Sequence, residues 1–97
     1  MATRQEQIMM HLYRYIGAEN KYAMHFATTQ DGIAEALGIS RGHASIVLKN
    51  LERKELVEHE IKHPYGGERS SRFTRRCYKL KTAGILATQD LFRKGAA

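Results

Sequence analysis

The sequence predicts a mainly helical α+β domain with a three-helix core, a short strand, a β-hairpin and a C-terminal helix. Three observations lead to this prediction. Apolar residues recur at helical spacing on both sides of a Gly-Ile-Ser turn at residues 38–40, as in two helices joined by a tight turn. Residues 56–63 alternate in polarity, and an extended pattern resumes at 73–80 after a turn-forming segment. Two further amphipathic stretches lie near the ends of the chain.

The N-terminal third is expected to contain a helix and then a short strand. The helix runs from Thr3 to about Gly17, and its apolar stripe consists of Ile8, Met9, Leu12, Tyr13 and Ile16. Gly17 ends this helix, and a polar loop follows. From Tyr22 to Ala27, large apolar residues alternate with smaller or polar ones, which suits a short strand.

The stretch from Thr29 to Val57 is predicted to form a helix-turn-helix. Thr28 or Thr29 caps the first of its helices, which spans residues 30–37. If Thr28 is the cap, Asp31 takes the third helical position of a capping-box-like arrangement, at the positive end of the helix dipole. Gly38 then supplies the left-handed backbone that ends this helix.

The second helix of this pair has the layout of a recognition helix. Ser40 caps it, and it continues to about Glu55. One face is predicted to be buried, because apolar residues repeat at helical spacing at Ala44, Val47, Leu48 and Leu51. Its start is polar and points away from the core, at Arg41, Gly42, His43 and Ser45.

A β-hairpin and a last helix are predicted to complete the chain. The strands are expected at Leu56–His63 and Phe73–Leu80, with strong turn chemistry at residues 64–68 between them. In the second strand, Tyr78 and Leu80 share a face. Thr82 is expected to cap the last helix, in which four residues are spaced to cover apolar surface: Ile85, Leu86, Leu91 and Phe92.

Length and composition favour one small intracellular domain. Ninety-seven residues suffice for one core, and a single proline argues against a linker. No apolar run approaches the roughly 20 residues that cross a bilayer, and we see no secretory or transit pattern. The lone cysteine excludes an internal disulfide framework, so a cytoplasmic protein is expected.

The positive charge is concentrated in one part of the chain. The net charge is +6, and residues 40–81 carry eleven basic and five acidic side chains, which accounts for the whole excess. Between Arg69 and Lys81 there are six basic residues and no acid. Such a local field attracts phosphate, so a nucleic-acid partner is indicated.

The sequence gives less support to metal binding, redox sensing or catalysis than to nucleic-acid binding. His59 and His63 would lie about 13 Å apart on a strand at ~3.3 Å per residue, too far to share a metal ion, so neither a metal nor another cofactor is expected. Cys77 has basic neighbours that favour a thiolate, but a lone cysteine in a strand is more often inert. No nucleophile signature or phosphate-binding glycine loop is present, so an enzyme is not predicted.

With this order of elements, the chain resembles the winged helix-turn-helix DNA-binding domains of prokaryotic transcription regulators, most of all the multiple-antibiotic-resistance-regulator (MarR-like) type. The resemblance spans Ile8 to Phe92, and it is carried by the fragments IAEALGIS (33–40), LKNLERKELV (48–57) and YKLKTAG (78–84). Two departures stand out. The chain has room for only one short helix at each end, where these regulators usually add dimerisation helices, and Glu55 occupies a position that is usually glycine.

The resemblance implies sequence-specific binding of double-stranded DNA by a single domain, 1–97, with the helix-turn-helix at 29–55, a hairpin called the wing at 56–81 and a terminal helix at 82–93. Base-edge contacts would come from Arg41, His43, Ser45 and Ile46, with Gly42 allowing close approach. Lys49 and Asn50 would hold phosphate. The wing would lie on the backbone or reach the minor groove through Arg69, Ser70, Ser71, Arg72, Arg75 and Arg76. The alternatives are a winged-helix module that binds protein or RNA, and the DNA-binding fragment of a longer regulator.

Apolar residues on the two terminal helices suggest a homodimer. A domain of this size cannot easily bury Met9, Met10 and Tyr15 together with the four apolar residues of the last helix. Two-fold pairing through these helices would place two recognition helices roughly 34 Å apart on a palindromic site. The sequence does not indicate the operator, an effector ligand or the sign of regulation.

Overall fold

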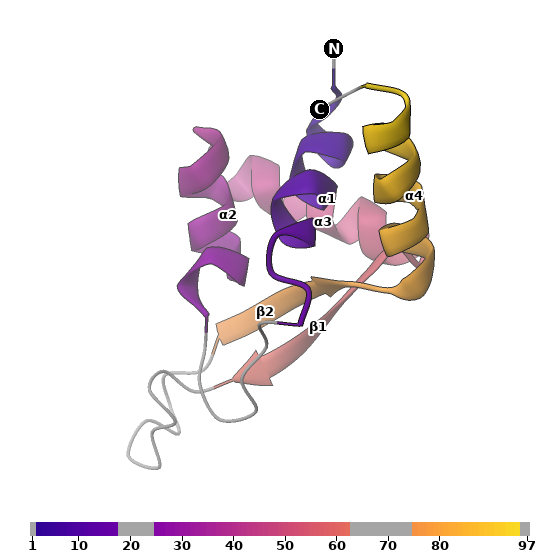
Figure 1. Ribbon diagram of the computed structural model, residues 1–97. Coiled ribbons are helices and arrows are strands. Elements are labelled where there is room, and N and C mark those ends of the chain that lie inside the picture. The colour runs from indigo at the N-terminus through magenta and orange to yellow at the C-terminus, as the bar shows by residue number, and fades with distance from the viewer. Residues whose placement is uncertain (1, 18–24, 63–74, 96–97) are drawn as a thin grey trace.

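A computed structural model describes residues 2–17, 25–62 and 75–95 (Figure 1). The elements follow in the order α1 (Arg4–Tyr13), a 3-10 turn η1 (Phe26–Thr28), α2 (Gln30–Leu37), α3 (Arg41–Arg53), β1 (Val57–Lys62), β2 (Arg75–Leu80) and α4 (Thr82–Arg93). The four helices gather on one side of the two-stranded sheet, and both described chain ends lie at the side of the helices away from the sheet. The predicted fold class, mainly helical α+β with a β-hairpin, is confirmed.

Helix α1 begins at a complete capping box. The Glu6 backbone N–H donates to Oγ1 of Thr3 at 3.1 Å, and the Thr3 N–H donates to Oε1 of Glu6 at 2.9 Å. Ile8 and Leu12 are almost fully buried, as the helical stripe predicted. The regular helix ends at Tyr13, before the predicted end at Gly17, and the chain continues to Gly17 in turns.

The predicted strand at Tyr22–Ala27 is not found in its described part. Residues 22–24 lie outside the described residues, and the chain forms a 3-10 turn from Phe26 to Thr28. The Thr28 hydroxyl donates to the His25 carbonyl at 2.9 Å, and the Thr29 hydroxyl donates to the Phe26 carbonyl at 2.7 Å. These local hydrogen bonds compete with a strand ladder, so a single bridge to β2, between Thr29 and Cys77, is all that forms here.

The helix-turn-helix forms as predicted. Thr29, one of the two proposed caps, accepts a hydrogen bond from the Gly32 N–H at 3.1 Å, and Asp31 therefore becomes the second helical residue rather than the third. Gly38 ends α2 with φ 67°, a left-handed conformation that glycine adopts without strain. Ser40 caps α3 by accepting the His43 N–H at 3.0 Å.

Helix α3 ends at Arg53, slightly before the predicted Glu55. Glu55 has φ 63°, so the chain keeps the left-handed exit even though a glycine is absent. The Leu56 N–H donates to the Leu51 carbonyl at 3.0 Å, which closes the helix end. The Glu55 carboxylate contacts Nζ of Lys81 at 2.5 Å, and this contact lowers the pKa of Glu55 and raises that of Lys81.

Strands β1 and β2 pair antiparallel, from Val57 opposite Leu80 to Lys62 opposite Arg75. Val57, Tyr78 and Leu80 join the apolar core with Ile8, Leu12, Ile33, Leu48 and Leu51. Cys77 is also buried, at the bridge to Thr29, so β2 is covered on both faces at this point. Burial raises the pKa of the Tyr78 hydroxyl.

Helix α4 lies very close to the chain that leaves α3. Its N-cap is Lys81 and not the predicted Thr82, and no side chain caps it. The Lys81 N–H donates to the Leu56 carbonyl at 2.9 Å, and a Cβ at Gly84 would lie 2.1 Å from that same oxygen. Of the four apolar residues expected to cover the core, Ile85 and Leu91 pack against it, whereas Leu86 and Phe92 remain 60% and 40% exposed. Among the described residues, none of the helices has the length and apolarity needed to span a bilayer.

Candidate nucleic-acid interface

The first two turns of α3 present side chains to solvent on a firmly packed base. Ala44, Val47 and Leu48 are buried against the other helices. The residues between and before them point outward: Arg41, Gly42 and His43 are exposed, Ser45 is half-buried, and Ile46 is 62% exposed. Lys49 is exposed and Asn50 half-buried one turn further on. All seven predicted α3 residues therefore lie where a ligand could reach them.

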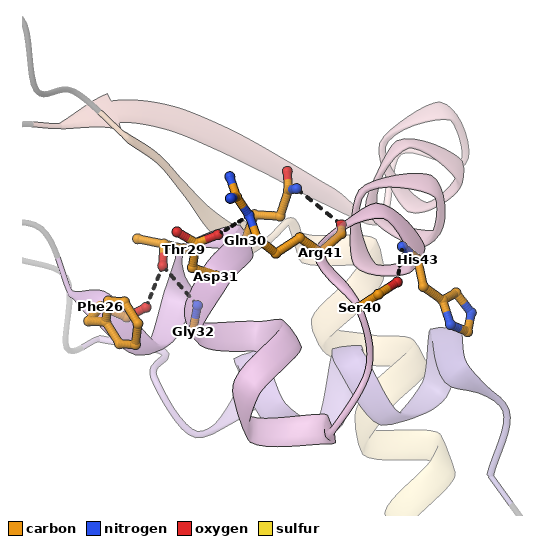
Figure 2. Close-up of polar contacts among 8 residues, drawn as sticks. All are labelled: Phe26, Thr29, Gln30, Asp31, Gly32, Ser40, Arg41 and His43. Atoms are coloured by element: carbon orange, nitrogen blue, oxygen red, sulfur yellow. Dashed lines mark hydrogen bonds and ion pairs between the residues drawn. The ribbon is translucent and has the colours of Figure 1, made fainter.

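The starts of α2 and α3 are tied together by two polar contacts (Figure 2). Nε of Arg41 lies 2.6 Å from Oδ1 of Asp31. The Gln30 side-chain amide donates to the Arg41 backbone carbonyl at 3.1 Å. His43 extends away from this pair, so its ring is held by neither contact. Arg41 is thus anchored at its backbone and at one edge of its guanidinium group.

A shallow hollow of about 190 Å³ joins the start of α3 to the first residues of β2. It is lined by Gln30, Asp31, Arg41, Arg75 and Arg76. The fold thus brings together the best base-reading candidate of the helix and two arginines predicted for the wing. Both wing arginines are exposed, and within the described residues no carboxylate forms an ion pair with either. Three guanidinium groups and one carboxylate give this hollow a net positive charge, which favours an anionic ligand.

The rest of the basic stretch is less positive in space than in sequence. Nζ of Lys79 lies 3.7 Å from Glu60 and 4.0 Å from Glu58, both on β1. Lys81 pairs with Glu55. Basic residues of the acid-free run therefore form ion pairs with carboxylates elsewhere in the fold. Among the described residues of this run, Arg75 and Arg76 are the strongest candidates for contact with an anionic ligand. Arg69, Ser70, Ser71 and Arg72 lie outside the described residues.

His59 is engaged by a carboxylate. Its Nδ1 lies 2.5 Å from Oε2 of Glu52, and its ring contacts the Tyr78 ring with centroids 5.6 Å apart. His63 lies outside the described residues. Within the part that the structure describes, no three His, Cys, Asp or Glu side chains converge on a common point.

Gln30 and Asp31 are site residues that the sequence analysis missed. Asp31 was interpreted as an acid at the positive end of the α2 dipole, a position that it does occupy. A signal was available, because the turn of a helix-turn-helix brings the first turns of its two helices close together. An acid in one first turn and an arginine in the other are therefore candidates for a pair.

Solved structures of a DNA-binding regulator share this fold. No protein-family model and no curated protein sequence matches the chain. The structure is similar to MepR, a transcription regulator of the Staphylococcus aureus multidrug efflux pump MepA, with a TM-score of 0.69 and 24% identity over 96% of this chain and 56% of that one. MepR in its DNA-binding conformation gives a TM-score of 0.70 at 24% identity, covering 96% and 57% of the two chains. A MepR–DNA complex gives 0.66 at 26% identity, covering 96% and 63%.

These matches confirm the winged helix-turn-helix fold of the MarR-like type over nearly the whole chain. The matched proteins are transcription regulators rather than enzymes. The chain spans only about three fifths of the length of the MepR chains that it matches.

Proposed function

We propose that the chain is a DNA-binding transcription regulator that reads double-stranded DNA with the start of α3 and holds its backbone with the wing. In this proposal residues 1–97 act as one DNA-binding domain, and the protein works in the cytoplasm. The hollow shared by Arg41, Arg75 and Arg76 is the observation that carries it. A recognition helix and a wing must face the same duplex, and these residues lie on one continuous surface.

Exposure and chemistry separate the residues that would contact base edges from those that would contact phosphate. Arg41 is the strongest candidate for a base contact, because a guanidinium group can pair with O6 and N7 of guanine in the major groove. His43, Ser45 and Ile46 lie on the same outward surface and would contact neighbouring base edges, and the open space around Gly42 allows the backbone to approach. Lys49, Asn50, Arg75 and Arg76 would contact phosphate, which sets position but not sequence. Arg69, Ser70 and Arg72 are proposed to extend these contacts along the wing.

A homodimer is proposed to form through α1 and α4. Exposed apolar side chains lie on α4, at Leu86 and Phe92, and just after α1, at Ile16 with 43% of its surface exposed. The residues expected to remain exposed near α1 do not, because Met9 is buried and Met10 and Tyr15 are half-buried. Tyr13 and Phe92 pack edge to face with centroids 5.2 Å apart, which joins the two helices in one surface. Such a surface suits a partner, and a second copy would supply the two-fold symmetry of a palindromic site. A longer regulator that carries its own dimer contacts remains the alternative.

Salt dependence of DNA binding tests the proposal. Binding of the chain to a fluorescent random-sequence duplex, followed by anisotropy at low and at raised salt, should be tight and then weaken steeply, because counterions are released from each neutralised phosphate. Indifference to duplex DNA at low salt would contradict the proposal and favour the protein-binding alternative. Binding to single-stranded or duplex RNA that is as tight as binding to duplex DNA would favour the RNA-binding alternative.

A further inference from the structure

We propose that Asp31 is a positioning residue that sets sequence specificity by holding the Arg41 guanidinium in a guanine-reading orientation. This inference rests on the proposed function, because it concerns how the α3 surface distinguishes one DNA sequence from another. Asp31 does not itself need to touch DNA. Its effect is transmitted through Arg41.

Asp31 contacts Arg41 at the one guanidinium nitrogen that end-on base pairing does not use. Oδ1 of Asp31 lies 2.6 Å from Nε of Arg41. Nε is at the inner edge of the guanidinium group, so the edge formed by the two terminal nitrogens stays open. Pairing with O6 and N7 of guanine uses such a pair of parallel N–H donors. The carboxylate therefore restrains the group without occupying the donors needed for base reading (Figure 2).

The two partners differ in how far they are buried. The Arg41 side chain is 74% exposed, whereas that of Asp31 is 31% exposed and its Oδ1 is shielded from solvent. No hydrogen bond to this oxygen is found within the described residues, so its contact with Arg41 is an ion pair. The acid is thus the fixed member of the pair and the arginine is the member that reaches outward.

The surroundings of the pair are rigid. Thr29 caps the helix that carries Asp31, and the Gln30 amide holds the Arg41 carbonyl at 3.1 Å. Gly32 lies so close to Phe26 that a Cβ there would be 2.0 Å from the Phe26 carbonyl oxygen, so the backbone of this turn of α2 packs directly against that of Phe26. Restraining a side chain before binding reduces the entropy lost when it meets its target.

The charge of Asp31 adds a second effect on specificity. A carboxylate in the hollow repels phosphate and offsets part of the attraction of Arg41, Arg75 and Arg76 for any backbone. It should therefore weaken binding to random DNA while it favours a site that offers guanine to Arg41. Removing the charge should weaken binding to the site that offers guanine and leave binding to random DNA equal or tighter, whereas a purely structural role would weaken both.

The experiment begins with the wild-type chain and a pool of random-sequence duplexes, from which repeated selection yields the preferred duplex. Dissociation constants are then measured for that duplex and for a shuffled duplex of the same length and composition. Asp31→Asn should weaken binding to the selected duplex roughly 3- to 10-fold, a fraction of what one bidentate base contact provides, and should leave shuffled binding equal or tighter. Glu35→Gln is the matched control, because it removes one negative charge from the same helix at an exposed residue without a described ion pair. This control should leave selected binding unchanged.

A double-mutant cycle with Arg41→Ala completes the test. If Asp31 acts through Arg41, adding Asp31→Asn to Arg41→Ala should cause no further loss on the selected duplex. An undiminished loss in that background, an unchanged ratio of the two constants, or equal losses on both duplexes would each overturn the inference. Asp31→Ser repeats the measurement if thermal unfolding shows that Asp31→Asn is not fully folded. A wild-type chain that selects no sequence would contradict the proposed function itself, whereas selection by the wild type and Asp31→Asn alike would overturn this inference alone.

Discussion

Replacing Gly84 by alanine should destabilise the protein, although alanine is the better helix former. Gly84 lies in the first turn of α4, where its Cα faces the Leu56 carbonyl. An added Cβ would lie 2.1 Å from that oxygen and 3.1 Å from Cδ2 of Leu80. The first contact involves backbone on both sides, so no side-chain rotation can relieve it.

The expected loss in the free energy of unfolding is the sum of three contributions. Moving α4 away by about 1 Å is an overpacking change of about 1–3 kcal/mol. It also strains the Lys81 N–H bond to the same carbonyl, whose net contribution is about 0.5–1.5 kcal/mol. Helix propensity returns up to about 1 kcal/mol in favour of alanine. A net destabilisation of about 0.5–4.5 kcal/mol remains, which lowers Tm by roughly 4–8 °C per kcal/mol in a chain of this size.

Urea and thermal unfolding measure this loss, with Gly42→Ala as the matched control. A Cβ at Gly42 meets nothing within 4 Å, so that substitution should stabilise the helix by about 0.5–1 kcal/mol. Opposite signs for the same chemical change would show that the contact with Leu56 decides the result. A Gly84→Ala protein as stable as the Gly42→Ala one would refute the reasoning and the close packing of α4.

Three further results are expected. Arg75→Ala with Arg76→Ala should lower the slope of log affinity against log salt by roughly 0.9 for each lost phosphate contact, while Arg14→Ala, which removes one positive charge at the end of α1, should leave the slope unchanged; an unchanged slope in the double variant would exclude these wing residues from the interface. The lowered pKa of Glu55 means that its pair with Lys81 contributes stability above the ordinary glutamate pKa and loses it as pH falls through the folded value. The urea midpoints of wild type and Glu55→Gln should therefore differ at neutral pH and converge as pH falls below the ordinary glutamate pKa; a constant difference would contradict this. Leu86→Glu with Phe92→Glu should convert a dimer to a monomer in sedimentation, and a wild-type monomer at tens of micromolar would rule out the proposed dimer.

The features that the sequence predicted well are governed by neighbours along the chain. Ser40 and Gly38 act as cap and helix stop because a side-chain oxygen and a left-handed backbone satisfy groups only a few residues away. The apolar stripe of α1 and the buried face of α3 follow from helical spacing alone. The resemblance to winged-helix regulators then predicted the fold that the solved MepR structures share.

The features that the sequence did not predict depend on tertiary contacts. A 3-10 turn forms where a strand was expected, because two threonine hydroxyls donate to backbone carbonyls that the hydrogen bonds of a β-ladder would have used. Cys77 is buried although it alternates with the core residues Tyr78 and Leu80, and Thr29 forms a bridge with it at the edge of β2. Lys79 pairs with acids of the other strand, which are distant in sequence. Asp31 pairs with Arg41, although the two residues were expected to have different roles. The spacing of residues along the chain does not predict such pairs.

Base reading by the start of α3 can be measured with three proteins and two duplexes. The dissociation constants of the wild type, Arg41→Ala and His43→Ala are measured on the selected duplex and on the shuffled one at a fixed salt concentration. Base contacts act on the difference between these two affinities, so we expect a large loss on the selected duplex and a small one on the shuffled duplex. Equal losses on both would contradict base reading, because they would show that these side chains touch only phosphate.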